Sequence, residues 1–360
     1  MRIVHTESSL GWGGQEIRIL SESQGLAKRG HEIRLLCPPE ARIYTEAPSW
    51  GLQPEAVPIA KKGFAGFSSL KNKFKAGGVD VVSTHSSTDS WLSALALRAL
   101  GRPYPMVRTR HISAAVPRNT FSTWLYTKAT ARIVTAGEAL KRDLVERNGF
   151  PGERIDSVPT GIDTGRFRPG DKMAARRTLG LPAEKTLIGI VATLRSWKGH
   201  RYLLQALPEE AGLVIVGDGP QRQALEAQVA ELKIQYKVLF AGNQKDVVPW
   251  LQSFDVFALP SYANEGVPQA LIQAMLCGLP CVTTNIGSMA ELAIDRKTAL
   301  VVAPENVDAL AAALHKLLQE KNLRESLGAA ARQHSAERFS YEGMLDRMEK
   351  IYKEAADAHR

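Results

Sequence analysis

The chain has 360 residues, which suffices for about two domains with a sizeable core, and its apolar content is ordinary for a globular protein. Its apolar runs fall short of the ~20 residues that a membrane-spanning helix needs, and its first residues enter a strand without the apolar core of a signal peptide. The net charge is +9, mostly from residues 1–165, which suits an anionic partner. Cys37, Cys277 and Cys281 fit a reducing compartment, so we expect a cytoplasmic location.

Strand and helix patterns alternate along nearly the whole chain, and this alternation predicts parallel sheets in an α/β fold. In the first half, we expect a helix at residues 15–28 and strands at residues 2–5, 32–37, 79–85, 106–109 and 131–135. In the second half, we expect helices at residues 199–206 and 269–277 and strands at residues 186–192, 213–216, 238–241, 256–259, 281–283 and 299–302.

A segment rich in proline, glycine and threonine, residues 158–170, lies between the two halves and is typical of a linker. We therefore expect one domain in residues 1–165 and a second in residues 166–340. Residues 341–360 carry apolar side chains at helical spacing, which predicts a terminal helix.

Residues 254–284 contain the most informative functional pattern of the sequence, and this stretch is predicted to form a strand, a loop, a helix and a strand. Such a unit places its loop and helix N-terminus at the carboxyl edge of a parallel sheet, where α/β folds bind ligands. The loop holds a single acid, Glu265, followed by Gly266, Val267 and Pro268, and Gln273 lies on the otherwise apolar helix. Because a helix N-terminus attracts anions, a phosphate-linked ligand would fit here. The alternative is an ordinary surface loop and a helix with one solvated Gln.

Other loops at predicted strand ends carry glycines and cations. Gly13 and Gly14 directly precede a helix, where backbone N–H groups can approach a phosphate or sugar, although a plain tight turn explains them equally well. Arg195 and Lys198 are three residues apart and would suit a diphosphate, with solvated surface cations as the alternative.

Two histidines, His85 and His111, end predicted strands of the first half, and Arg108 and Arg110 add positive charge beside His111. A histidine at a strand end is a candidate polar contact for a ligand, although a lone histidine is more often a satisfied core or loop residue. The cluster of Arg108, Arg110 and His111 is a candidate binding site for a phosphate group of the acceptor.

Residues 61–75 interleave lysines with Phe64, Phe67 and Phe74. Basic and apolar residues together are typical of a segment that lies on an anionic membrane surface. A solvated loop and helix with Phe64, Phe67 and Leu70 in the core is an equally good interpretation. Nucleic acid is not expected as a partner, because no recognition helix or aromatic RNA-binding motif accompanies the charge.

The pattern S-x-x-x-E-G-x-P-x-x-L-x-x-A-M-x-x-G-x-P, which begins at Ser261, resembles the donor-site signature of retaining glycosyltransferase family 4. The linker resembles the family's V-P-N-G-x-D-x-x-x-F-x-P, with Thr160 in place of Asn. The loop at Arg195 resembles G-R-L-x-x-x-K-G, with Thr193 at the usual Arg position and Lys198 matching directly. Gln273 stands where the family has its second Glu.

This resemblance implies the GT-B architecture, in which two Rossmann-like doubly wound domains face each other across a cleft and a C-terminal helix crosses back to the first domain. It implies retaining, metal-independent sugar transfer without a cofactor. The donor would be a nucleotide-sugar, and the acceptor a saccharide or a lipid-linked saccharide of cell-envelope polysaccharide or lipopolysaccharide biosynthesis. The protein would be cytoplasmic or peripheral on the inner face of the plasma membrane.

The resemblance also assigns roles to residues. The expected catalytic residues are Glu265, His85, Arg195 and Lys198. The expected donor-binding residues are Gly13, Gly14, Arg195, Lys198, Gly217, Gly242, Asn243, Glu265, Gly266, Val267, Pro268 and Gln273. The positive cluster at the end of the same strand, and not the resemblance, gives the expected acceptor-binding residues, which are His111, Arg108 and Arg110. Two rivals remain: a nucleotide-sugar epimerase or hydrolase of the same fold, and a catalytically impaired nucleotide-sugar-binding relative, suggested by Thr160, Thr193 and Gln273.

Overall fold

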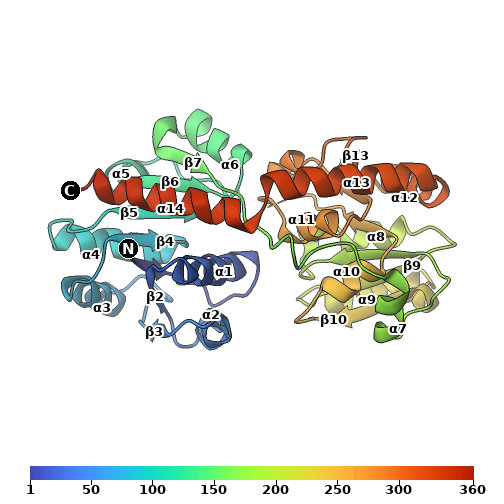
Figure 1. Ribbon diagram of the computed structural model, residues 1–360, viewed down its shortest axis with the longest axis horizontal. Helices are drawn as coiled ribbons and strands as arrows, with labels where there is room; N and C mark the ends of the chain where they lie inside the picture. Colours follow the sequence, from blue (N-terminus) through green and yellow to red (C-terminus); the bar gives the residue numbers. More distant parts are fainter. Residues whose placement is uncertain (113, 264) are drawn as a thin grey trace. The chain divides into compact units, whose positions relative to one another are not determined.

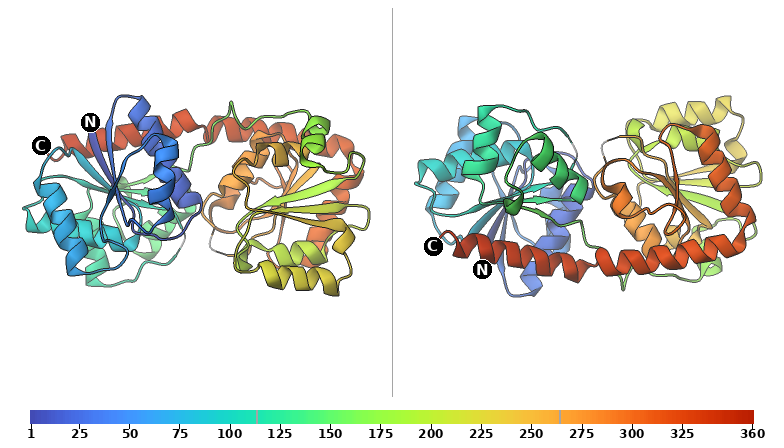
Figure 2. Two further views of the ribbon diagram at one scale, coloured as in Figure 1. Left: turned by 90° about the horizontal axis from the view of Figure 1, so that it is seen from below. Right: turned by 90° about the horizontal axis from the view of Figure 1, so that it is seen from above.

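The computed structural model describes residues 1–112, 114–263 and 265–360, so Ser113 and Asn264 lie outside the described residues. The chain divides into two compact units, which are Met1–Thr160 together with Glu342–Arg360, and Gly161–Tyr341 (Figure 1). Each unit is built on one parallel sheet, with helices on both faces of that sheet (Figure 2). The predicted α/β class with parallel sheets is confirmed.

The sheet of the first unit has the strand order β3-β2-β1-β4-β5-β6-β7 in the described residues. Its strands are β1 (Arg2–Thr6), β2 (Glu32–Cys37), β3 (Pro54–Ala56), β4 (Val81–Thr84), β5 (Met106–Arg110), β6 (Arg132–Thr135) and β7 (Ile155–Ser157). The helices of this unit are α1 (Gly14–Lys28), α2 (Arg42–Glu46), α3 (Phe64–Lys75), α4 (Ser87–Ala99), α5 (Thr120–Trp124), α6 (Glu138–Arg142) and α14 (Tyr341–Asp357).

The sheet of the second unit has the order β10-β9-β8-β11-β12-β13 in the part of the chain that the structure describes. Its strands are β8 (Leu187–Val191), β9 (Gly212–Val216), β10 (Val238–Gly242), β11 (Val256–Leu259), β12 (Cys281–Thr284) and β13 (Leu300–Val302). Its helices are α7 (Lys172–Leu179), α8 (His200–Gln205), α9 (Arg222–Glu231), α10 (Val248–Ser253), α11 (Gln269–Leu276), α12 (Val307–Gln319) and α13 (Lys321–Arg338).

The central strands form where the sequence has continuous apolar runs, because both faces of these sheets are covered. Strand β9 (Gly212–Val216) is buried along its whole length, and so are β4 and β11. The sequence patterns missed β3 and β7, which form the two edges of the first sheet and have three residues each. A strand of that length shows no periodicity, and only its pairing with a neighbour defines it.

Strand order reverses direction once in each sheet. In the first unit β1 pairs with both β2 and β4, and in the second unit β8 pairs with both β9 and β11. The loops that leave the carboxyl ends of the two central strands diverge at such a point and leave a crevice between them. Residues 7–14 and His85 follow β1 and β4, while residues 193–198 follow β8, and residues 261–263 and Glu265 follow β11.

The terminal helix α14 packs on the first unit, as expected (Figure 1). On its buried face, Tyr352 lies with its hydroxyl 2.8 Å from Glu22 Oε1 and 2.9 Å from Ser83 Oγ. Glu22 in turn lies 3.6 Å from the fully buried guanidinium of Arg18. On the rim of the interface, Arg29 makes ion pairs with three acids of α14: Glu342, Asp346 and Glu349. The buried bonds therefore hold α14 to helix α1 and strand β4.

We predict that Tyr352→Phe lowers the free energy of unfolding of the first unit by about 1–3 kcal/mol, because it removes the buried hydroxyl that bonds Glu22 Oε1 and Ser83 Oγ. Urea unfolding followed by tryptophan fluorescence measures the change. Tyr104→Phe is the matched control, since the Tyr104 hydroxyl makes no hydrogen bond to any described residue. Equal stability of Tyr352→Phe and wild type would show that the buried hydroxyl contributes nothing to holding α14.

Candidate active site

In the second unit, the structure brings together two of the predicted residues, Lys198 and Glu265. Lys198 ends a 3-10 turn after β8 (Ser196–Lys198), and Glu265 lies in the loop between β11 and α11. Lys198 Nζ lies 2.5 Å from Glu265 Oε1, and Ser261 Oγ donates to the same oxygen at 2.7 Å. Glu265 is almost wholly buried, with a relative exposure of 4% for the residue. Its negative charge is therefore compensated by one cation and one hydroxyl.

Two glycines allow the loops of this site to approach each other closely. Gly287, at φ +52°, sits so near the Glu265 backbone that a Cβ atom would lie 2.1 Å from the Glu265 carbonyl oxygen. Gly199, at φ +77°, follows Lys198, and a Cβ there would lie 2.0 Å from the carbonyl oxygen of Pro260. Both positions favour glycine, because φ is positive there and because a Cβ atom would clash with a backbone carbonyl oxygen. They allow the loop after β12 to approach Glu265 and the loop after β8 to approach Pro260.

The remaining predicted residues of the second unit lie on the same carboxyl edge. Arg195 is exposed, and its guanidinium lies 5.5 Å from the centre of the Trp197 ring, so it does not join the Lys198–Glu265 pair. Gly217 N donates to Gly242 O at 2.8 Å, which joins the ends of β9 and β10. Pro268 is the N-cap of α11. The others are an exposed Asn243, a buried Val267, and half-buried Gly266 and Gln273.

In the first unit, the loop after β1 contains a buried acid that the sequence patterns did not single out. Glu7 Oε1 accepts hydrogen bonds from Ser86 Oγ at 2.5 Å and from Ser9 N at 2.7 Å, and Oε2 accepts from Gln15 Nε2 at 2.6 Å. Burial, with the nearby charge of Asp89, raises the pKa of Glu7 to about 8. Its position directly after β1 is the only sequence signal that could have drawn attention to it.

Asp89 is a second buried acid at this edge. It occupies the third position of α4 and forms a capping box with Ser86. Its carboxylate also accepts from Thr6 Oγ1 at 2.9 Å and from His85 N at 2.9 Å. Burial raises the pKa of Asp89 to about 6. The S-x-x-D pattern at Ser86 could have predicted the cap, but not its burial. The predicted Gly13 and Gly14 lie further along the loop that contains Glu7, at the N-cap and first position of α1.

The predicted His85 and His111 lie side by side with a third histidine, His5. His5 Nδ1 lies 2.9 Å from His85 Nε2, and His85 Nδ1 lies 3.1 Å from His111 Nε2. Burial lowers the pKa of all three rings, and it holds those of His85 and His111 well below the usual value. The two distances show that each ring nitrogen of His85 lies within hydrogen-bond distance of another histidine. Of the three histidines, only His111 is partly exposed.

The predicted arginine cluster separates into an inner and an outer member. Arg108 is buried, lies 4.4 Å over the ring of Tyr126, and has its pKa lowered by burial. Arg110 donates to Tyr126 Oη at 2.9 Å and to the carbonyl oxygens of Ile112 and Ala114. It also lines a cavity of about 270 Å³ together with Arg118 and Arg147. Arg110 therefore faces open space at the carboxyl edge, and Arg108 does not.

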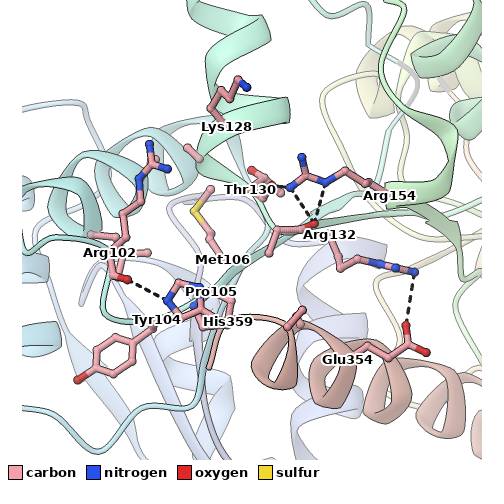
Figure 3. A pocket seen from close by; sticks show the side chains of 16 residues that line it. Arg102, Tyr104, Pro105, Met106, Lys128, Thr130, Arg132, Arg154, Glu354 and His359 are labelled. Carbon is pink, nitrogen blue, oxygen red and sulfur yellow. Dashed lines mark hydrogen bonds and ion pairs between the residues drawn. The ribbon is translucent and has the colours of Figure 1, made fainter.

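A larger cavity of about 420 Å³ lies at the opposite, amino edge of the first sheet, between the starts of β5 and β6 and the end of α14 (Figure 3). Its arginines are largely engaged within the protein. Arg154 donates to the carbonyl oxygens of Thr127, Thr130 and Ala131, and Arg132 pairs with Asp156 and, at 3.6 Å, with Glu354. This cavity contains none of the predicted site residues.

Comparison with known proteins agrees with this geometry. The family model Glycosyltransferase Family 4 matches residues 12–166, and the model Glycosyl transferases group 1 matches residues 171–334. The D-inositol 3-phosphate glycosyltransferase of Mycobacterium marinum is 28% identical, over 95% of this chain and 81% of that protein.

Solved structures show the same fold. The structure of Anabaena Alr3699/HepE in complex with UDP-glucose superimposes with a TM-score of 0.88 at 19% identity, over 98% of this chain and 100% of that one. WaaG, a glycosyltransferase involved in lipopolysaccharide biosynthesis, superimposes with a TM-score of 0.73 at 19% identity, over 99% of each chain.

The chain has two α/β units with parallel sheets, a terminal helix that returns to the first unit, and an acid–cation pair at the carboxyl edge of the second sheet. These features define a nucleotide-sugar-dependent transferase of the GT-B fold. The chain belongs to the group 1 / family 4 glycosyltransferases and is a retaining enzyme of the hexosyltransferase type. The family and fold class expected from the sequence are confirmed.

The pKa of Glu7 leads to a prediction about stability. Because its pKa rises from an unfolded value near 4.5 to about 8, the folded state holds a proton that the unfolded state has lost. This contribution to stability is complete below about pH 4.5 and is lost as the pH rises through about 8. We expect Glu7→Gln to lose less stability than wild type between about pH 5 and about pH 9.

Urea unfolding at the two pH values measures this difference, with Glu153→Gln, at an exposed carboxyl, as the control. The same pH dependence in Glu7→Gln and wild type would mean that Glu7 is ionised in the folded protein at neutral pH.

Proposed function

We propose that this glycosyltransferase moves a sugar from a nucleotide-sugar such as UDP-glucose to a saccharide or lipid-linked acceptor in cell-envelope polysaccharide or lipopolysaccharide biosynthesis. The observation that carries the proposal is the buried Lys198–Glu265 pair at the carboxyl edge of the second sheet, where its strand order reverses. The donor class is supported by the similar HepE structure, which contains UDP-glucose. The pathway is supported by the likeness to WaaG.

The chemistry of sugar transfer suits this pair. The transition state of retaining transfer resembles an oxocarbenium ion, with positive charge at the anomeric carbon and negative charge on the leaving diphosphate. Lys198 would stabilise the diphosphate, and Glu265 would orient the sugar and offset the positive charge. Without a donor, the two side chains neutralise each other at 2.5 Å. The diphosphate of a bound donor would supply a negative charge to Lys198, and the transition state would supply a positive charge to Glu265.

The surrounding residues would complete the donor site. Arg195 is exposed and has no ion pair among the described residues, so it is available to a phosphate. The amide of Gln273 would hydrogen-bond the ribose hydroxyls, without the charge assistance that a Glu provides. The other donor contacts in this unit would come from Gly217, Gly242, Asn243, Gly266, Val267 and Pro268. In the first unit, the backbone N–H groups of Gly13 and Gly14 would contribute.

An anionic acceptor would fit the first unit. Arg110, Arg118 and Arg147 line one cavity, and of these Arg147 is partly neutralised by Asp143 at 3.8 Å. A phosphate group is a strong ligand for such arginines. The similar Mycobacterium marinum protein is named for a phosphorylated acceptor, D-inositol 3-phosphate. We propose that Arg110, with His111 beside it, contacts the acceptor. The buried Arg108 would support the end of β5, which carries these two residues.

We predict that Glu265→Gln nearly abolishes sugar transfer and leaves the fold intact. The amide keeps the shape and can still accept from Ser261, but it removes the negative charge that opposes the oxocarbenium ion. Initial rates of nucleotide release with an acceptor present measure the effect, and thermal unfolding checks the fold. A variant that keeps about half of the wild-type turnover contradicts the role of Glu265. Analysis of products with and without acceptor separates a transferase from an epimerase or a hydrolase.

We further predict that Lys198→Ala weakens binding of the nucleoside diphosphate by roughly ten- to a hundredfold, since a charge-assisted bond to phosphate contributes about 1.5–3 kcal/mol. Arg195→Ala is expected to have a smaller effect in the same direction. Calorimetric titration with nucleoside diphosphate measures both, and Lys245→Ala, at an exposed lysine of the same unit, is the control. Unchanged binding by Lys198→Ala would place the diphosphate elsewhere.

Attachment to an anionic membrane is the second part of the proposal. In α3 the side chains of Leu70 and Phe74 are in the core, whereas Phe64 is 82% exposed and lies beside a half-buried Phe67. Lys73 pairs with Glu55 at 2.6 Å. The other lysines of this segment have no ion pair among the described residues, and they are Lys61, Lys62, Lys71 and Lys75. No described helix is both long enough and apolar enough to cross a bilayer.

We predict that the protein sediments with anionic vesicles at low salt and is released at about 1 M salt, where the screening length falls to about 3 Å. Each lysine near an anionic surface contributes about 1 kcal/mol. The variant with Lys61→Glu, Lys62→Glu and Phe64→Ser should lose sedimentation and keep its activity on a soluble acceptor. Lys245→Glu with Lys297→Glu makes the same change of charge in the second unit and is the control. Binding that survives the triple change excludes this segment as the anchor.

A further inference from the structure

The cavity of about 420 Å³ in the first unit lies where three segments that are far apart in the sequence meet (Figure 3). They are the end of α4 with the loop to β5, the start of β6 with the turn before it, and the end of α14. The cavity volume falls in the range of sites that bind small molecules. Because β5 and β6 are parallel, this amino edge is opposite to the edge that carries Arg110 and His111. A ligand here would therefore not occupy the proposed acceptor site.

Part of the cavity wall is apolar. Leu97 of α4, Met106 of β5 and Ala355 of α14 line the cavity and are buried, and Ala129 is half-buried. Covering apolar surface with an apolar group is more favourable than leaving it in water. An inorganic ion would leave this wall in contact with water, so the wall favours a ligand with an organic part.

Arg154 brings a positive charge to the opposite part of the wall. Its half-buried guanidinium donates at 2.7 Å to Thr127 O, at 2.8 Å to Thr130 O and at 3.2 Å to Ala131 O. These carbonyl oxygens are neutral, so they orient the guanidinium without cancelling its charge. No acid in the described part of the chain forms an ion pair with Arg154. Its charge is therefore fixed in place and available to an anion.

Arg102 and Lys128 add two further positive charges. Both residues are exposed and line the cavity, and neither side chain has a hydrogen bond or an ion pair with any described residue. In the view of Figure 3, Arg102 and Arg154 lie on opposite sides of the cavity, and Lys128 lies above them. An anion in the cavity would thus meet cations from more than one side.

The backbone holds Arg102 in an unusual conformation. Its φ is +60°, in the left-handed region that few residues other than glycine adopt. Its N–H donates to Leu97 O at 2.7 Å, and its carbonyl oxygen accepts from His359 Nε2 at 2.9 Å. A long cationic side chain is therefore held at a position where glycine or asparagine would be less strained. Strain of this kind is concentrated at ligand sites.

The acids near the cavity are already paired. Glu354 lies 3.6 Å from Arg132 and 3.8 Å from Lys350, and Asp156 lies 2.7 Å from Arg132. These two carboxylates offset the charges of Arg132 and Lys350. The positive charges of Arg102, Lys128 and Arg154 remain without a counter-charge from the described residues.

We propose that this cavity is a second binding site, for a small organic phosphate, which is a phosphate monoester on a compact apolar group. A phosphate monoester carries about −1.5 to −2 charges at pH 7, which matches three cations better than the single charge of a carboxylate. Arginine and lysine are strong phosphate ligands, and the apolar wall would cover the organic part. The site goes beyond the proposed function and does not depend on it.

Met106 provides a reporter inside the cavity, where its side chain is drawn in Figure 3. The full chain is labelled with methyl-¹³C methionine and titrated with phenyl phosphate, and Met106→Leu assigns the signal. We expect a saturable shift of the Met106 methyl signal and no shift of Met275 and Met289 in the second unit. Saturating nucleoside diphosphate should leave the titration unchanged, because it fills the donor site. An unmoved Met106 signal, or one that does not saturate, overturns the proposal.

Variants at exposed positions test the cations and the space separately. We expect Arg102→Gln with Lys128→Gln to weaken phenyl phosphate binding about tenfold or more, since each removes a charge-assisted bond. Ala358→Leu, at an exposed residue that lines the cavity, should weaken binding by filling space. Lys245→Gln with Lys297→Gln makes the same change of charge in the second unit and is the control. Equal binding by the cavity charge variant and this control overturns the assignment, and if the cavity variants do not fold, the wild-type titration still decides it.

The parts of the ligand are tested with three further probes. Inorganic phosphate lacks the apolar group, and benzyl alcohol lacks the charge, so both should bind more weakly than phenyl phosphate. Inorganic phosphate that binds equally well would indicate an adventitious ion only, and equal binding of benzyl alcohol would show that the cations play no part. Dihexanoyl phosphatidic acid, dissolved as a monomer, distinguishes the source of the phosphate. Tighter binding of this lipid, lost in the cavity charge variant, assigns a lipid headgroup, whereas tighter binding of phenyl phosphate assigns a soluble compound.

Discussion

The reversal of strand order in each sheet is the constraint on which the candidate site depends. Side chains that are far apart in the sequence meet only because the carboxyl ends of parallel strands lie along one edge. Lys198 and Glu265 are 67 residues apart, and they are joined because β8 and β11 are neighbours. His5 and His85 are 80 residues apart and are joined in the same way by β1 and β4. In both units, adjacent parallel strands bring distant residues together, and they form an ion pair in the second unit and a histidine cluster in the first.

The two carboxyl edges differ in their electrostatics. The second unit keeps a carboxylate and an ammonium in direct contact, so the charges are present before a ligand arrives. The first unit instead buries acids and imidazoles in positions that favour their neutral forms. Glu7 has its pKa raised to about 8, and the histidines have theirs lowered.

The terminal helix contributes to the first edge through its buried face. Tyr352 meets both Glu22 and His5, so α14 takes part in the polar network beneath the histidine cluster. Arg18 donates to Val158 O at 2.6 Å, near the point where the chain leaves the first unit. The last residues of the chain therefore do more than cover the sheet, because they supply the hydroxyl that bonds the buried Glu22.

The sequence alone determined the class of fold, most of the strands, the family and the loops that carry Lys198 and Glu265. Alternating apolar segments and a glycine- and proline-punctuated loop are local features, and local features can be read from one chain. It did not predict the edge strands β3 and β7, the burial of Arg108, or the acids Glu7 and Asp89. Nor did it predict that His85 has no free nitrogen. Those properties arise where several strands meet, since burial and hydrogen-bond partners depend on residues far away in the sequence, and only the tertiary structure brings them together.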